Sequence, residues 1–190
     1  PTVSRALKDS PDISRALCEK AKWMAREMNY RPNPFALSLR KNAPRIIGVV
    51  VPDIVTHFFA SILNGIENMA VKNGYFVIIT TSHESYEHEK RNVENLVNMR
   101  VEGIIACLSQ ETTDYTHFAE LKDINMPLIM FDRVCLTDQF SSVVADGEHS
   151  AQMATQHLLD NGCKRVAFIG GANHLDIVKR RKHGYLEALR

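Results

Sequence analysis

The fold is decided by the stretch IIGVVVPD at residues 46–53. A run of apolar residues and glycine without polar alternation is typical of a parallel strand that is covered on both faces. A helical pattern follows from His57 to Asn73, and Gly74 behind it suits the end of a helix. A strand and a helix at this spacing predict the first half of a strand–helix–strand unit.

The same alternation continues along the chain after this first unit. It predicts further strands over 75–80, 103–108, 128–131 and 166–169, a shorter extended piece over 142–145, and helices over 87–99, 115–124, 149–160 and 179–190. Repeated units of this kind predict an α/β fold with a doubly wound parallel sheet.

Composition limits the class of protein. With 190 residues and 45% hydrophobic content, the chain can bury one core and carry a small appendage. No apolar run approaches the length of a membrane span, so we expect no membrane partner. The four cysteines are scattered and show no paired spacing. Free thiols in the cytoplasm fit this pattern better than disulfides or zinc.

Charge divides the chain into two parts. Residues 1–45 hold ten Lys/Arg and four Asp/Glu, a net charge of +6, and the remainder holds thirteen and eighteen, a net charge of −5. In the basic part, 2–7 has a short helical pattern, with Thr2 and Arg5 off its apolar side. A second helix is expected after Asp12 as its N-cap, with Cys18 and Trp23 as packing residues. Two short basic helices are consistent with DNA binding, although a charged helix face is usually only solvated.

A proline-rich junction separates the two parts. Pro32 and Pro34 break an incoming helix, and 35–39 can form one helical turn with Ala36, Leu39 and Arg40 along one side. A turn this short is not stable alone. The junction is therefore either an inter-domain linker or a segment that is ordered by a polyanion.

Polar residues follow the predicted strands, at the sheet edge where parallel sheets bind ligands. Carboxylates and arginine there, beside an aromatic wall, suit a sugar or a similar small polar ligand. An aspartate after a strand can equally be a turn former or a helix cap. We expect Phe58 in the core, and one of Phe58 and Phe59 facing outward. The strand-end positions are Pro52-Asp53, Thr81-Ser82, Ser109-Gln110, Asp132-Arg133, Asp146 and Gly170-Gly171.

Other chemistry finds little support. The sequence holds no GxSxG, P-loop, HExxH, CxxC or GxGxxG motif. His83, Glu84, Glu87, His88 and Glu89 could bind a metal, but we expect them to form the solvated start of a helix. We therefore expect no catalytic residue, no metal site and no cofactor. An α/β enzyme that uses Asp132 or Asp146 remains an alternative, without a visible base–nucleophile pair.

Several segments resemble the lactose-repressor (LacI/GalR) family of bacterial transcription regulators. In the basic part these are PTVSRAL at 1–7, MNYRPN at 28–33 and ALSLR at 36–40. In the α/β part they are VEGII at 101–105, MPLI at 126–129, VAD at 144–146, GCKRVAFIGG at 162–171 and RKHGY at 181–185. The order and spacing of the segments near the N-terminus are highly specific, and the resemblance covers almost all of the chain.

For DNA, the resemblance implies that TVSR belongs to the recognition helix of a helix-turn-helix, which lies in the major groove. Arg5 is then the best candidate for a bidentate contact to guanine. Leu39 would wedge between base steps in the minor groove. The implied DNA-binding residues are Thr2, Arg5, Asn33, Ala36, Leu39 and Arg40.

For the effector, the resemblance implies a periplasmic-binding-protein-like domain. Residues 1–31 would form a partial helix-turn-helix, 32–45 the hinge helix and linker, and 46–190 the N-terminal part of the effector-binding and dimerisation domain. An earlier helix and a second effector subdomain would complete the two parts. The implied effector-binding residues are Asp53, Phe58, Phe59, Asp132, Asp146 and Arg181.

The resulting hypothesis is a ligand-responsive, sequence-specific transcriptional regulator, most simply a repressor. It would act in the cytoplasm, at the nucleoid, as a homodimer on pseudo-palindromic double-stranded operator DNA. Its effector would be a small molecule, a sugar or a sugar derivative. The alternative is a sugar-binding protein of the transport type, which shares the fold and does not bind DNA.

Overall fold

The computed structural model describes residues 2–30 and 45–190 of the chain. The chain divides into two compact units, residues 1–43 and 44–190.

The first unit holds two helices, α1 (Thr2–Ala6) and α2 (Arg15–Glu27). Ala6 is fully buried between them, and the Lys22 ammonium lies 2.6 Å from the Asp9 carboxylate. The helix α2 ends in a Schellman motif, in which the Tyr30 amide donates to the Ala25 carbonyl at 2.8 Å. Asn29 takes the left-handed conformation of this motif, with φ 46°.

Two expectations for α2 are wrong. The N-cap is Ser14 and not Asp12, so the helix begins later than predicted. Trp23 is 59% exposed and does not pack, whereas Cys18 is buried as expected. Apolar side chains of α1 and α2 line a groove with a volume of about 330 Å³. Val3, Leu7, Leu17, Ala21, Met24 and Met28 are among its lining residues.

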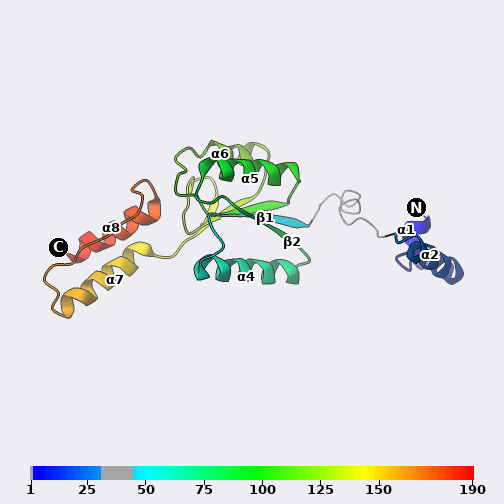
Figure 1. The fold of residues 1–190 in the computed structure, drawn as a ribbon, viewed down its shortest axis with the longest axis horizontal. Coiled ribbons are helices and arrows are strands. Elements are labelled where there is room, and N and C mark those ends of the chain that lie inside the picture. Colours follow the sequence, from blue (N-terminus) through cyan, green and yellow to red (C-terminus); the bar gives the residue numbers. More distant parts are fainter. Residues whose placement is uncertain (1, 31–44) are drawn as a thin grey trace. The chain divides into compact units, whose positions relative to one another are not determined.

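The second unit is an α/β domain with five parallel strands in the order β2-β1-β3-β4-β5. Figure 1 shows α4 against one face of the sheet and α5 with α6 against the other. The predicted doubly wound sheet is therefore confirmed. Its elements are β1 (Ile46–Val51), α4 (His57–Lys72), β2 (Phe76–Thr81), α5 (Tyr86–Asn98), β3 (Gly103–Ala106), α6 (Thr116–Asp123), β4 (Leu128–Phe131), β5 (Ser141–Val143), α7 (Gly147–Asp160) and α8 (Asp176–Ala188).

The central strand β1 is buried on both faces. Val49 and Val51 pack with Phe59 and Leu63 of α4, and Val50 belongs to the core on the opposite face. Each fully buried valine contributes about 1.5–3 kcal/mol to the stability of the fold.

A glycine in the middle of β1 has a steric cause. A Cβ atom on Gly48 would lie only 2.7 Å from a methyl group of Leu96 in α5. The glycine therefore lets α5 approach the centre of the sheet.

The strand predicted over 166–169 does not form. These residues lie outside any helix or strand, and Ile169 is 97% exposed. Within 45–190 no described strand pairs with this stretch, so its backbone has no ladder to join. It is held instead by Tyr185, whose hydroxyl donates to the Val166 carbonyl at 2.8 Å and whose ring stacks on Phe168 at 5.4 Å.

Helices α7 and α8 pack closely against each other. A Cβ atom on Gly184 would collide with the backbone carbonyl of Glu148, so the two backbones meet at this glycine. The His183 ring lies 3.0 Å from the Glu148 carboxylate beside this contact. None of the described helices has the length and apolar character needed to cross a membrane.

This contact gives a test of the fold. Gly184→Ala should lower the free energy of unfolding by about 1–3 kcal/mol, because the new methyl group overpacks a backbone contact. The matched control is Gly65→Ala in α4, where no atom lies within 4 Å of the new Cβ. That change should stabilise the domain by roughly 0.5–1 kcal/mol, as alanine does within a helix. Urea unfolding measures both, and equal effects at the two sites would contradict the close α7–α8 packing.

Candidate functional site

The carboxyl end of β1 leads into a tight turn made by Asp53. Its carboxylate accepts hydrogen bonds from the Ile54 amide at 2.6 Å and the Val55 amide at 3.0 Å. Both bonds use the same oxygen, Oδ1. Asp53 is thus a turn former at a half-buried position, and its other oxygen is free of these two bonds.

The aromatic pair at the start of α4 divides its roles. Phe59 is buried and meets Phe131, the last residue of β4, edge to face at 6.4 Å. Phe58 is 49% exposed and contacts Phe59 edge to face at 5.2 Å. The expectation that Phe58 is the core residue is wrong, because the first turn of α4 directs Phe59 toward the sheet. One of the two does face outward, as predicted, so only Phe58 offers an open aromatic face.

Asp132 directly follows β4 and has a left-handed backbone conformation, with φ 58°. Its amide donates to the Val143 carbonyl of β5 at 3.1 Å. Burial raises the pKa of the Asp132 carboxyl, and the positive charges of Arg133 and Arg181 partly offset that rise. Asp132 is therefore a half-buried carboxylate with two cations near it.

Asp146 and Arg181 both lie near the start of α7. Asp146 caps this helix by accepting a hydrogen bond from the His149 amide at 3.0 Å. The Arg181 side chain from α8 lies 3.3 Å from the position of a Cβ on Gly147, the next residue. Since the charge of Arg181 also acts on Asp132, the structure brings Asp132, Asp146 and Arg181 to one region. Asp53 and Phe58 belong to the β1–α4 junction, which the Phe59–Phe131 contact connects to the end of β4.

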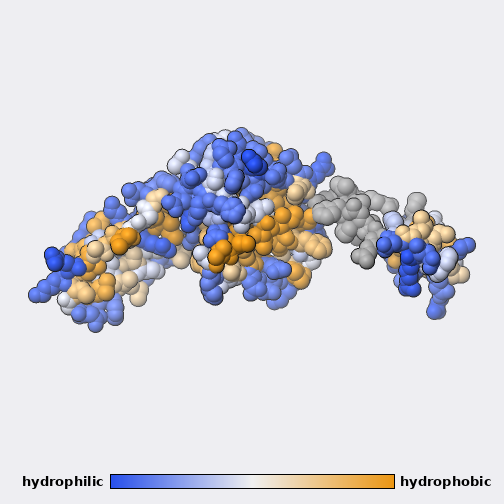
Figure 2. Space-filling model, viewed as in Figure 1, coloured by the Kyte–Doolittle hydropathy of each residue, from blue (hydrophilic) through white to orange (hydrophobic). Residues whose placement is uncertain are grey.

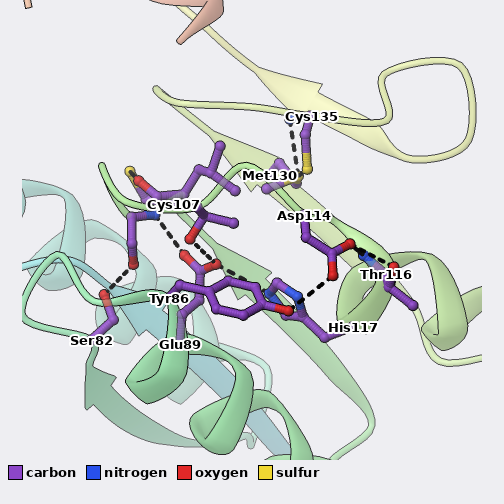
Figure 3. A network of polar contacts seen from close by, with 12 residues as sticks. Ser82, Tyr86, Glu89, Cys107, Asp114, Thr116, His117, Met130 and Cys135 are labelled. Carbon is purple, nitrogen blue, oxygen red and sulfur yellow. Dashed lines mark hydrogen bonds and ion pairs between the residues drawn. The ribbon is translucent and has the colours of Figure 1, made fainter. Parts of the chain in front are cut away.

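The segment after β3 is held by a buried carboxylate, which the sequence analysis did not predict. Figure 3 shows Glu89 of α5 at the centre of a polar network. Its side chain is fully buried and accepts hydrogen bonds from the Ser109 amide at 2.6 Å, the Thr112 hydroxyl at 2.8 Å and the His117 ring at 3.1 Å. The Ser82 and Ser109 hydroxyls, 2.5 Å apart, connect the ends of β2 and β3 beside it.

The expectation of a solvated helix start is wrong for Glu89. Glu89, Val93 and Leu96 are the buried residues of α5, so the carboxylate shares the apolar face of the helix. That spacing was the available signal, because residues four and seven positions apart lie on one side of a helix.

An ion pair that the sequence analysis did not predict connects the ends of β2, β3 and β4. The Arg133 guanidinium donates to both oxygens of Glu84, at 3.0 and 2.7 Å, and also lies 3.5 Å from the Leu108 carbonyl. Glu84 in addition accepts from the Gln110 amide at 2.7 Å. Arg133 stood beside a predicted site residue, but nothing in the sequence indicated its partner 49 residues away.

Two cysteines near this edge are packing residues. Burial raises the pKa of the Cys107 and Cys135 thiols to about 12. Both are therefore neutral near pH 7, and neither offers the thiolate that nucleophilic chemistry or metal binding requires.

The DNA-binding prediction falls partly within the described residues. Thr2 and Arg5 are exposed on α1, while Ala6 faces α2. Arg5 is thus free to meet a ligand, as the sequence pattern predicts. Asn33, Ala36, Leu39 and Arg40 lie outside the described residues.

The buried network makes a stability test possible. Glu89→Gln should lower the free energy of unfolding by about 1.5–3 kcal/mol, because an amide cannot replace a charged acceptor of three donors. Glu87→Gln, an exposed position on the same helix, is the matched control and should change it by less than about 0.5 kcal/mol. Urea unfolding at pH 7 measures both, and a neutral Glu89→Gln change would show that the carboxylate does not hold the strand end.

Comparison with known proteins places this architecture in a family. The sequence profile described as periplasmic binding proteins and sugar binding domain of LacI family matches residues 45–190. Catabolite control protein A of Priestia megaterium is 31% identical over 192 residues, which cover 98% of this chain and 57% of that protein. The chain therefore spans little more than half the length of this relative.

Solved structures agree with this match. The lac repressor dimer bound to operator and an anti-inducer has a TM-score of 0.77 at 25% identity, covering 99% of this chain and 57% of that chain. The Cra transcriptional dual regulator of Pseudomonas putida in complex with fructose 1-phosphate has a TM-score of 0.72 at 25% identity, covering 77% and 54%. With residues 45–190 matched by this profile and 98% of the chain matched by catabolite control protein A, the chain belongs to the LacI family.

Proposed function

We propose that the chain acts as a ligand-responsive, sequence-specific DNA-binding transcriptional regulator, most simply a repressor. A small-molecule effector, a sugar or a sugar derivative, would control its affinity for the operator. The observation that carries the proposal is the joining, in one chain, of an exposed Arg5 helix to an α/β domain of this family.

The effector would bind at the carboxyl ends of β1, β4 and β5. Asp53, Asp132 and Asp146 supply oxygens for hydroxyl groups, Arg181 supplies donors, and Phe58 supplies an open ring for an apolar sugar face. Phe59 would contribute by holding Phe58 and Phe131 rather than by direct exposure. The fructose 1-phosphate in the Cra structure supports a sugar-type effector.

The DNA contact would be made by Thr2 and Arg5 in the major groove, with Asn33, Ala36, Leu39 and Arg40 at the hinge. Arg5 is exposed and makes no described ion pair, whereas Arg15 is paired with Glu19 at 3.3 Å and Lys22 with Asp9. A free guanidinium suits bidentate recognition of guanine. The lac repressor structure, a dimer bound to operator, supports DNA binding as the function of this unit.

A homodimer would place two such helices on two half-sites. Apolar side chains gather over the β2 edge of the sheet, between α4 and α5 (Figure 2). Exposed apolar residues of α4 and β2 are Met69, Phe76 and Ile79, which are 60%, 70% and 43% exposed. A separate apolar hollow of about 640 Å³ lies between α4 and the strands β1 and β3. An exposed apolar patch of this kind is suited to burial against a second copy.

The sugar-binding protein of the transport type is the second candidate. The family profile covers both types of protein, so the α/β domain alone does not separate them. The first unit does, because the match to catabolite control protein A covers 98% of this chain and so includes that unit. We therefore prefer the regulator.

Selection from random DNA duplexes tests the proposal. The protein in its full natural length should select a pseudo-palindromic sequence, since two copies would bind with two-fold symmetry. Arg5→Ala should weaken binding to that sequence by about 1–3 kcal/mol, roughly 5- to 150-fold, and relax one base position. Arg15→Ala is the matched control and should retain the selected sequence.

Two results would count against this function. A selected site without two-fold symmetry would argue against the dimer. Sequence-blind binding that disappears with added salt would reduce the first unit to a basic appendage and favour the transport-type protein.

A further inference from the structure

Backbone strain is concentrated at one edge of the sheet. Among the described residues, eight non-glycine residues have positive φ. Asp9, Asn29, Arg100 and Asn125 follow the ends of helices, where this conformation is common. The other four, His83, Glu84, Asp132 and Leu136, all follow β2 or β4 at their carboxyl ends.

Such conformations cost free energy and persist only where surrounding contacts fix them. For Asp132, these contacts are made by the residue before it and the residue after it in the chain. Phe131 before it is buried against Phe59. Arg133 behind it accepts a hydrogen bond from the Leu108 amide at 3.1 Å through its carbonyl, and its guanidinium reaches Glu84.

The Glu84–Arg133 pair is itself firmly held. The Arg133 side chain is 20% exposed and that of Glu84 is 37% exposed, so water reaches the pair only in part. Glu84 also accepts from the Gln110 amide, and the adjacent Ser109 amide donates to the buried Glu89. Two carboxylates from the β2–α5 segment thus fix two consecutive amides after β3, and one of them also fixes Arg133.

We propose that Glu84 and Arg133 are positioning residues, which hold Asp132 in its left-handed conformation and thereby set its carboxylate for a hydroxyl-bearing effector. This inference rests on the proposed function, in which Asp132 touches the effector. Neither Glu84 nor Arg133 needs to contact the effector itself. They act through the backbone of Asp132. Arg133 is its neighbour at the end of β4, and Glu84 lies after β2, outside the β1, β4 and β5 contact set.

The physical consequence is a coupling between Glu84 and Asp132. In Glu84→Gln, the Arg133 guanidinium loses the charged two-oxygen acceptor of its bonds and retains only one neutral amide oxygen. Asp132 can then relax to an extended conformation, which is the ordinary one for a non-glycine residue. Its carboxylate would turn from a half-buried place toward water.

The pKa of the Asp132 carboxyl, measured by NMR titration without any effector, reports this movement. Burial is the largest influence on that pKa and raises it, and the charges of Arg133 and Arg181 lower it. Glu84→Gln should therefore lower the pKa of Asp132 toward that of an exposed aspartate. Because loss of the Glu84 charge would also lower this pKa, the backbone chemical shifts of Asp132 are measured alongside it. They should leave their left-handed values in Glu84→Gln, and a lowered pKa with unchanged backbone shifts would contradict the positioning role.

Glu102→Gln is the matched control. Glu102 is also half-buried, and its carboxylate raises the pKa of Tyr75 near it, but it precedes β3 at the opposite end of the strands. It should leave the pKa of Asp132 unchanged. If Glu84→Gln leaves that pKa at its wild-type value as well, the positioning role is overturned.

Binding of ribose, cellobiose and fructose 1-phosphate by calorimetry separates this inference from the proposed function. For a sugar that binds, Glu84→Gln should weaken affinity at least tenfold, and Glu102→Gln less than twofold. In an Asp132→Asn background, Glu84→Gln should add no further loss, whereas a general loss of structure would add the same factor in both backgrounds and contradict positioning. If none of the three sugars binds the wild type while the pKa moves as expected, the positioning stands and the proposed effector class fails.

Discussion

The burial of β1 on both faces is the constraint on which the rest of the α/β domain depends. Val49 and Val51 face α4, and Val50 faces the opposite core, so a helix layer is needed on each side. Parallel strands require crossovers, and the crossovers supply these layers. In the order β2-β1-β3-β4-β5, β2 lies on one side of β1, and β3, β4 and β5 follow on its other side. All strands then end at one edge, where their polar residues gather.

That edge combines two kinds of polar group. Asp53, Asp132, Asp146 and Arg181 are partly or fully open to solvent and suit a small polar ligand. Glu89, by contrast, is fully buried and satisfied by three donors, which gives it a structural role. A buried carboxylate is tolerated because the hydrogen bonds replace its water shell. The open groups can bind because the buried ones keep the strand ends in place.

Much of this arrangement could be predicted from the sequence, because apolar periodicity and strand–helix alternation act locally. The strand at 128–131 matches β4 residue for residue, and the helix at 57–73 differs from α4 by one residue. The predicted strand at 166–169 does not form. An apolar pattern indicates only that a segment can form a strand, and a strand also needs a neighbouring strand to pair with. The sequence analysis assigned Phe58 to the core in place of Phe59. Two adjacent residues at the start of a helix differ only in the direction in which the helix turns them, and local pattern does not fix that direction. Arg133 and Glu84 lie too far apart in sequence for any local pattern to join them.

The central claim is that sugar binding and operator binding are coupled in one protein. The most direct test is to measure operator affinity with and without a bound sugar, and sugar affinity with and without the operator. We predict that both affinities change by the same factor, about 5- to 150-fold, equivalent to roughly 1–3 kcal/mol, because linkage is reciprocal. An operator affinity that no bound sugar alters would contradict the account and leave the two units without a functional connection.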